Sequence, residues 1–287
     1  MTAPLALLVE QELSQGVDAR VTAMAQAIAD RHGAASRAVL FYGSCLREKQ
    51  LDGLMLDFYL IVSDYRAAYN KGWMARANAL LPPNVFPFEH DGLAAKYAVL
   101  SEADFARLNG PQTRNVSVWA RFAQPSRLVW ASDDGSRMRA VAAIAQAAPT
   151  LLAAAGRVDG EEPLDWWRRA FALTYSAELR AERKARSGSV VDSDVDRYRR
   201  FSVPAIAAIE GGALSGGWAR RRLEGKALSV VRLAKASATY AGGIDYIAWK
   251  INRHAGTAIE IKPWQRRHPL LAAISLLPRL LRSGAVR

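Results

Sequence analysis

The sequence is poor in the residues that build disulfide frameworks and cysteine-rich metal centres. Among its 287 residues it has one cysteine, Cys45. A single cysteine excludes a disulfide within the chain and any zinc site that needs several thiolates, and it favours a reducing compartment. The histidines have no spacing typical of metal ligands; they are His32, His90, His254 and His268. The sequence therefore predicts neither a disulfide scaffold nor a zinc centre.

Long hydrophobic runs are also missing, although 51% of the residues are apolar. No run reaches the roughly 18 apolar residues of a membrane-spanning helix. The N-terminal stretch has no basic leader before its short apolar run, and Glu10 and Glu12 follow directly. We therefore expect neither a spanning helix nor a signal or transit peptide. The apolar half of the chain is enough for a sizeable core in one large or two ordinary domains.

Negative charge is scarce in the second half of the chain. The whole sequence has a formal net charge of +12. Residues 1–150 hold 15 Lys and Arg against 14 Asp and Glu, whereas residues 151–287 hold 24 against 13, a net of +11. This asymmetry indicates a polyanionic partner for the second half: nucleic acid, an anionic membrane surface or a phosphorylated substrate. An ordinary solvated basic surface is the alternative.

Hydrophobic periodicity predicts an α/β region followed by a helical region. The predicted helices of the first region span 17–32 and 65–80, and the predicted strands span 38–42, 54–62, 93–101 and 127–132. Ser101 and Asp104 have the spacing of a capping box before a short helix. From about Ser136 the pattern is helical nearly to the end, with loops near 186–196 and 210–217. We expect one domain over residues 1–140 and a helical, basic domain over 141–287.

One carboxylate stands in an otherwise apolar strand. Asp57 lies between Met55 and Leu60 in the stretch MLDFYLIV, where an ionised group costs several kcal/mol unless something compensates it. Gly43 and Ser44 follow the preceding strand, and a glycine lets backbone come close to a phosphate while a serine adds a donor. A Mg²⁺ ion bound to Asp57 and bridging triphosphate oxygens is one compensation. A salt bridge within the sheet is the other.

A strand, a Gly-Ser loop, a short helix and an acid-bearing strand resemble the polymerase-β-type nucleotidyltransferases. This resemblance implies an α+β fold, in which a mixed sheet flanked by helices precedes an all-α C-terminal domain. That superfamily usually has two acids on the strand, but Met55 occupies the first position here. A second metal ligand would have to come from elsewhere, for example from Asp52, Glu89 or the substrate.

The single-acid strand is more similar to one branch of that superfamily. The chain resembles the mitochondrial-type CDP-diacylglycerol synthases, the phosphatidate cytidylyltransferases of the mitochondrial translocator assembly and maintenance family. The resemblance covers roughly residues 39–200, with a looser echo at 235–251. The segments that carry it are FYGSCLRE, MLDFYLIVSD, AKYAVLSEADF, WARFAQPSRLV and YSAELR.

The resemblance implies a function and a set of site residues. CTP and phosphatidic acid would react with Mg²⁺ as cofactor, giving CDP-diacylglycerol and pyrophosphate. The implied catalytic residues are Asp57, which also binds the metal, and Lys96. The implied nucleotide-binding residues are Tyr42, Gly43, Ser44 and Arg121. The residues implied for phosphate or the lipid headgroup are Glu178, Arg180 and Arg183. Lys96 facing solvent, and Arg180 in an ordinary helix-face ion pair, are the alternatives.

The C-terminal segment suits a membrane interface. Residues 262–283 place Trp264 and several basic residues before an apolar stretch that ends in arginines. This pattern fits an amphipathic helix lying among lipid headgroups, and with the basic second half it predicts peripheral attachment to the inner, cytoplasmic face of an anionic bacterial membrane. A terminal helix packed on the core or in a homodimer interface is the alternative.

Two rival functions remain at this point. One is a nucleotidyltransferase that acts on another phosphorylated acceptor. The other is a degenerate nucleotidyltransferase domain that binds nucleic acid through the basic half, for which Met55 is the best support. Few aromatic residues alternate with the basic ones, as base stacking would need, so we do not expect nucleic acid as the partner.

Overall fold

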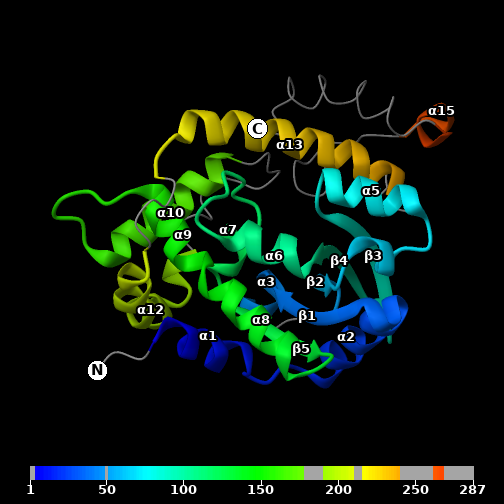
Figure 1. Ribbon diagram of the computed structural model, residues 1–287, viewed down its shortest axis with the longest axis horizontal. Helices are drawn as coiled ribbons and strands as arrows, with labels where there is room; N and C mark the ends of the chain where they lie inside the picture. The colour runs from blue at the N-terminus through cyan, green and yellow to red at the C-terminus, as the bar shows by residue number, and fades with distance from the viewer. Residues whose placement is uncertain (1–3, 49–50, 178–189, 210–214, 240–260, 268–287) are drawn as a thin grey trace.

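The computed structural model describes residues 4–48, 51–177, 190–209, 215–239 and 261–267, and the fold is given for these residues (Figure 1). The strands are β1 (Ser36–Tyr42), β2 (Met55–Val62), β3 (Asn84–His90), β4 (Leu93–Ser101) and β5 (Ser126–Ala131). The helices before β5 are α1 (Leu5–Leu13), α2 (Ala19–His32), α3 (Ser44–Glu48), α4 (Tyr65–Ala68), α5 (Gly72–Leu80), α6 (Glu102–Asn109) and α7 (Trp119–Phe122). Those after it are α8 (Asp134–Ala145), α9 (Ala147–Ala155), α10 (Pro163–Ala177), α12 (Val195–Ala207), α13 (Trp218–Thr239) and α15 (Pro263–Arg267).

The five strands form one mixed sheet in the order β3-β4-β2-β1-β5. β2 and β4 run parallel, while the other neighbouring strands pair antiparallel. The elements that the structure describes after β5 are all helices, so the described fold is α+β with a mixed sheet flanked by helices, as the sequence predicts. The division at residue 140 stays a prediction, and the apolar packing on one face of the sheet continues across that position.

Each face of the sheet has its own apolar cluster. One face packs on α2, through Val21, Met24 and Ile28, and on Tyr65 and Tyr69 of the segment that follows β2. The other face packs on α1, α6 and α7, and beyond these on α8, α9, α10 and α12. Because side chains alternate along a strand, consecutive residues of β2 belong to different clusters.

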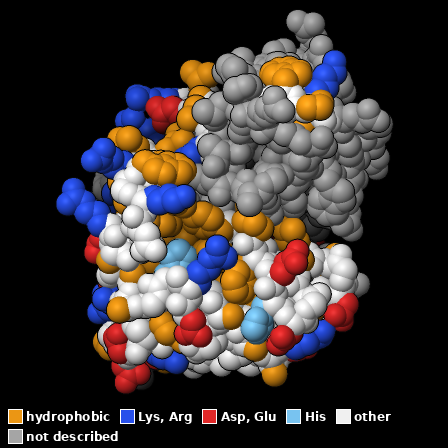
Figure 2. Space-filling view, turned by 90° about the vertical axis from the view of Figure 1, so that its right-hand side faces the viewer, with side chains coloured by type: hydrophobic (Ala, Val, Ile, Leu, Met, Phe, Trp, Pro, Cys, Tyr) orange, Lys and Arg blue, Asp and Glu red, His pale blue; other side chains and the backbone are white. Residues whose placement is uncertain are grey.

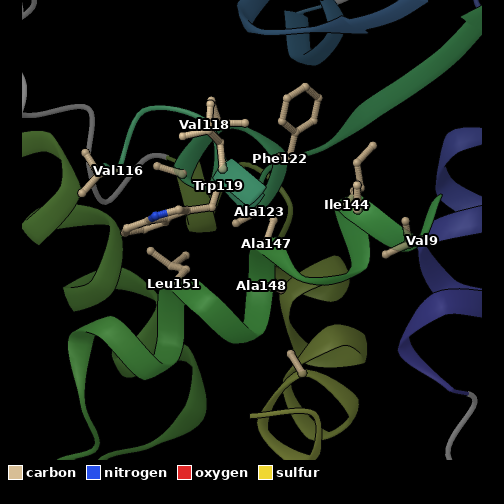
Figure 3. Close-up of a cluster of buried hydrophobic side chains, with 14 of the residues drawn as sticks. Val9, Val116, Val118, Trp119, Phe122, Ala123, Ile144, Ala147, Ala148 and Leu151 are labelled. Carbon is tan, nitrogen blue, oxygen red and sulfur yellow. The ribbon is translucent and has the colours of Figure 1, made fainter. Parts of the chain in front are cut away.

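Helix α7 is a single turn held deep in the second cluster. Trp119, Ala120 and Phe122 are almost completely buried. Figure 3 shows Trp119 directed toward Leu151 of α9, while Phe122 leaves α7 in a different direction. In that direction the Phe122 ring packs against Tyr59 of the sheet, with ring centroids 5.2 Å apart. The backbone of α7 is thereby fixed between α9 and the sheet.

The structure confirms most predicted elements, divides one helix into two, and adds strand β3 and helices α1 and α7. Asp18 caps α2 and Gly33 ends it, and the Ser101 hydroxyl accepts a hydrogen bond from the Asp104 amide at 3.2 Å, as the capping box predicts. The single helix predicted over 65–80 is wrong, because the chain is extended at Tyr69 and forms α4 and α5 separately. The sequence does not predict strand β3, which is one of the two edge strands, where Pro87 is tolerated.

One helical stretch passes a length and composition test for crossing a membrane. It is Asp134–Ala155, which comprises α8 and α9, and 67% of its apolar window is buried inside the fold. Core helices of globular proteins pass the same test, so this stretch is weak evidence for a membrane span.

Candidate functional site

A row of polar side chains crosses the sheet beneath α7. The register places Tyr42 of β1 opposite Asp57 of β2, and Asp57 beside Lys96 of β4. On the far side of β1, Tyr42 also pairs with Ser126 of β5. Paired residues in neighbouring strands point to the same face, and here that is the face covered by α1, α6 and α7. Residues far apart in the sequence therefore meet in one line.

Asp57 and Lys96 form an ion pair within this row. Oδ1 of Asp57 lies 2.7 Å from Nζ of Lys96, and the two side chains are 18% and 26% exposed. Both groups are therefore largely shielded, and each keeps a small solvent-exposed part. The ammonium group supplies the compensation for Asp57 that the sequence leaves open, and the alternative in which Lys96 simply faces solvent is wrong.

Gly43 passes directly beside the Asp57 carboxylate. Its φ angle is +97°, and an added Cβ would lie 3.0 Å from Oδ2 of Asp57. Both the backbone conformation and the close approach favour glycine here. Ser44 follows at the start of α3 and is partly exposed. The glycine of the Gly-Ser turn therefore lies against the carboxylate; a role of the turn in holding a triphosphate stays a prediction.

Arg121 reaches the same row from above. Its guanidinium donates a hydrogen bond to the Tyr42 hydroxyl, and Nη1 also donates to the Ser117 carbonyl. Burial raises the pKa of Tyr42 well above its usual range, the negative charge of Asp57 raises it further, and Arg121 opposes both. Tyr42 is therefore a neutral hydroxyl at physiological pH. Its ring packs on Phe122 of α7, at 6.1 Å between centroids, which brings α7 close to the row.

Basic residues of α13 hold the two loops that border the site. Arg232 donates to Ser117 Oγ at 3.0 Å and, through Nε and Nη2, to the Pro82 carbonyl at 3.0 and 2.7 Å. Lys235 donates to the Leu81 and Pro83 carbonyls. Burial, followed by the charge of Arg232, lowers the pKa of Lys235 to about 8. The sequence shows only that this half is basic, because backbone acceptors have no sequence signature.

Neither carboxylate suggested as a second metal ligand lies beside Asp57. Asp52 is exposed and pairs with Arg20 of α2 at 2.8 Å, on the opposite side of the sheet. Glu89 is exposed on β3, with β4 between it and β2. Neighbouring strands are about 4.8 Å apart, so Glu89 sits roughly 10 Å from the β2 backbone. The geometry therefore does not support Asp52 or Glu89 as a second metal ligand beside Asp57.

Several predicted site residues lie outside the described part of the chain. They are Glu178, Arg180 and Arg183, and most of the predicted interfacial segment 262–283. Of that segment, residues 262–267 are described, and Trp264 of α15 is 44% exposed. The residues that the structure does bring together are Tyr42, Gly43, Asp57, Lys96 and Arg121, with Ser44 adjacent in the chain.

The row offers a Mg²⁺ ion a single carboxylate. Oδ1 of Asp57 is buried and, despite the short contact with Lys96, has no hydrogen bond of acceptable geometry. Among the described residues, no group of three or more Asp, Glu, His or Cys side chains gathers as a metal cage. Mg²⁺ commonly binds through one or two carboxylates together with waters and substrate phosphates. The residues present fit an ion that arrives with a nucleotide.

Comparisons with protein-family models and with curated proteins give no match.

Proposed function

We propose that this protein is a nucleotidyltransferase of the polymerase-β type whose site is the Tyr42–Asp57–Lys96 row. More narrowly, we propose a phosphatidate cytidylyltransferase that makes CDP-diacylglycerol and pyrophosphate from CTP and phosphatidic acid. The observation that carries the proposal is the partly exposed Asp57–Lys96 pair, with Gly43 against the carboxylate on one side and Arg121 above it. The motif resemblance supplies the base and the acceptor.

The row has the donors that a triphosphate needs. Gly43 has no side chain, so the loop backbone lies directly against the Asp57 carboxylate, and a glycine in such a loop also lets the backbone come close to a phosphate. Lys96 would exchange part of its contact with Asp57 for a phosphate oxygen. Arg121 offers a planar fork of donors that matches phosphate geometry, and Tyr42 stays protonated and orients that fork.

The reaction needs positioning and charge neutralisation rather than a strong base. A phosphate oxygen of the lipid attacks the α-phosphorus of CTP, and the bond to the bridging oxygen of pyrophosphate breaks. The attacking phosphate monoester is already an anion, so no proton has to be removed from it. Mg²⁺, when bound at Asp57, would neutralise charge on the triphosphate and on the departing pyrophosphate. Lys96 and Arg121 contribute fixed positive charge to the same end.

The described surface supports a lipid partner. Trp73 and Leu80 on α5 are 51% and 86% exposed, and Lys71 and Arg76 are exposed beside them. Figure 2, which faces the side that carries α5 and β3, shows hydrophobic side chains beside lysine and arginine in its upper part, and acidic side chains mainly in its lower part. Exposed apolar and basic groups together fit an anionic membrane surface. We propose peripheral attachment at the cytoplasmic face of a bacterial membrane.

Pyrophosphate release tests the proposal. Purified protein is incubated with CTP, Mg²⁺ and vesicles with or without phosphatidic acid, and inorganic pyrophosphate is measured. We expect release only when phosphatidic acid is present and none from Asp57→Asn. Absence of release from the wild-type protein under all these conditions would overturn the proposal.

The ion pair also favours a second candidate. Because Lys96 already neutralises Asp57, the domain could be a degenerate nucleotidyltransferase that binds nucleic acid and no longer transfers nucleotides. A third candidate is a nucleotidyltransferase of the same fold that transfers the nucleotide to a different phosphorylated acceptor. Screening the four nucleoside triphosphates against several phosphorylated acceptors, with a nucleic-acid mobility shift at matched salt, separates the three.

A further inference from the structure

Side chains of helix α13 donate hydrogen bonds to the segment that precedes α7. Arg221 donates to the Thr113 and Arg114 carbonyls at 3.2 and 3.0 Å, and Arg232 donates to Ser117 Oγ at 3.0 Å. The acceptors of these three hydrogen bonds all belong to residues 113–117. This segment ends two residues before α7, the helix that carries Arg121.

A close helix contact fixes where α13 lies. An added Cβ at Gly225 would come 2.2 Å from the carbonyl oxygen of Ala177, at the C-terminal end of α10. Only a glycine permits this approach without moving one of the helices. Two turns later, Arg232 and Lys235 hold the loop that precedes β3. Figure 1 shows α13 passing above α10, α7 and α6 toward α5, along the side of the molecule opposite α1.

Ser117 connects the α13 contact to Arg121. Its side chain accepts from Arg232, while its backbone carbonyl accepts from Arg121. Ser117 is 4% exposed, so neither acceptor is readily replaced by water. The Arg232 guanidinium also spans to Pro82, just before strand β3, and β3 pairs with β4, the strand that carries Lys96. The Arg232 guanidinium therefore contacts two loops, one that leads to Arg121 and one that leads to β3, the neighbour of the strand that carries Lys96.

We propose that Arg232 is a positioning residue that sets the orientation of Arg121 through Ser117. The basic helical half would then act on the nucleotide site indirectly. It would fix the guanidinium of Arg121, which belongs to α7. This inference rests on the proposed function for its nucleotide readout. It assigns to α13 a role that its charge alone does not describe.

A double-mutant cycle tests the coupling. Arg232→Gln is expected to weaken Mg²⁺·CTP binding about tenfold, and Ser117→Ala, which keeps the carbonyl, to weaken it less. In an Arg121→Gln background neither substitution should weaken binding further. Arg232→Lys keeps the charge but does not reproduce a fork that spans two acceptors, so we expect it to behave as Arg232→Gln.

Lys235→Gln is the matched control. Lys235 lies one turn away on the same helix and holds the same loop before β3, through the Leu81 and Pro83 carbonyls. We expect it to lower thermal stability about as much as Arg232→Gln while changing the affinity for Mg²⁺·CTP less than about twofold. Equal losses of affinity in the two variants, additivity with Arg121→Gln, or rescue by Arg232→Lys would each overturn the inference.

Hydrogen exchange in the nucleotide-free protein separates this inference from the proposed function. Arg232→Gln and Ser117→Ala should accelerate amide exchange in residues 117–122 about tenfold, whereas Lys235→Gln should leave that segment unchanged. If wild-type protein binds no nucleotide, the proposed function fails, and the exchange result still decides whether Arg232 holds the segment that carries Arg121. Unchanged exchange in Arg232→Gln contradicts the inference.

Discussion

The two faces of the sheet are built from neighbouring residues but differ in their chemistry. On the α2 face, Phe41, Phe58 and Tyr97 are almost completely buried, and the rings of Phe41 and Phe58 lie 5.2 Å apart. One residue along each strand, on the opposite face, stand Tyr42, Asp57 and Lys96. A shift of register by one residue would exchange the two sets, so the site depends on the register that the apolar face enforces.

The histidine on the α2 face is satisfied within the fold. His32 contacts the Ala68 carbonyl through Nδ1 and the Tyr97 hydroxyl through Nε2, each at 3.1 Å. Because Nδ1 faces a carbonyl it must carry the hydrogen, so Nε2 accepts from Tyr97. Burial lowers the pKa of His32, which keeps the ring neutral. The α2 face thus holds a neutral, paired polar group, whereas the charged Asp57–Lys96 pair lies on the opposite face.

The largest expected effect separates the two faces by activity. Asp57→Asn should lower the rate of nucleotidyl transfer by about a thousandfold or more, since it removes the carboxylate that the described residues contribute to the row. Folding should be retained, because the asparagine side chain is neutral and Lys96 is partly exposed to water. Steady-state pyrophosphate release and circular dichroism measure the two quantities. An Asp57→Asn protein that unfolds, or one that keeps the wild-type rate, would contradict the claim that Asp57 serves activity and not folding.

The next effect tests the close approach beside the carboxylate. Gly43→Ala should lower activity about a hundredfold, because the new methyl group displaces the Asp57 carboxylate from its place. Gly53→Ala is the control: Gly53 also has a positive φ, +73°, but nothing lies within 4 Å of its added Cβ. Both variants should be destabilised by backbone strain, while Gly53→Ala keeps its specific activity. Equal activity in the two variants argues against a site at Asp57.

A smaller effect is expected on the opposite face. Phe58→Leu should cost about 1 to 2 kcal/mol of unfolding free energy through lost packing against Phe41. The specific activity of the folded protein should stay within about twofold of wild type, since the ring points away from the site. Urea denaturation followed by a rate measurement checks both expectations. A loss of activity as large as that of Asp57→Asn would show that the two faces are not functionally separate.

The smallest effect concerns the positive charge that α13 buries beside the site. Burial lowers the folded pKa of Lys235 to about 8, below its ordinary value of 10.5. Between these two pH values the unfolded chain binds more protons than the folded one, so stability rises with pH in this window. As the pH rises through this window, we expect the unfolding free energy of wild type to increase by about 1 kcal/mol relative to that of Lys235→Met, after solvent screening. A difference that does not vary with pH contradicts a buried ammonium at this position.

Local patterns in the sequence predict much of the fold. The strands β1, β2, β4 and β5 are recognisable because each is mostly apolar, and β2 and β4 each contain a single charged residue, Asp57 and Lys96. Strand β3 escapes prediction because Pro87 interrupts its run and an edge position tolerates that residue. The break between α4 and α5 escapes it too, because nothing in the local periodicity requires Tyr69 to be extended.

The candidate site is predictable as residues but not as contacts. Gly43 and Asp57 stand out through local rules, a turn glycine and a charge in an apolar strand. The Asp57–Lys96 pair depends on the register between β2 and β4, which is a property of two segments together. The contacts of Arg232 depend on acceptors that are mostly backbone carbonyls, which any sequence offers, so only the structure shows them.

The binding of a nucleoside triphosphate together with Mg²⁺ at the Asp57 row is the central claim. Isothermal titration of CTP into wild type and Asp57→Asn, each with and without Mg²⁺, measures this directly. We predict binding to wild type that requires Mg²⁺, and a loss of that requirement and of most affinity in Asp57→Asn. Binding of equal strength to both proteins, or no binding to wild type, would contradict the claim.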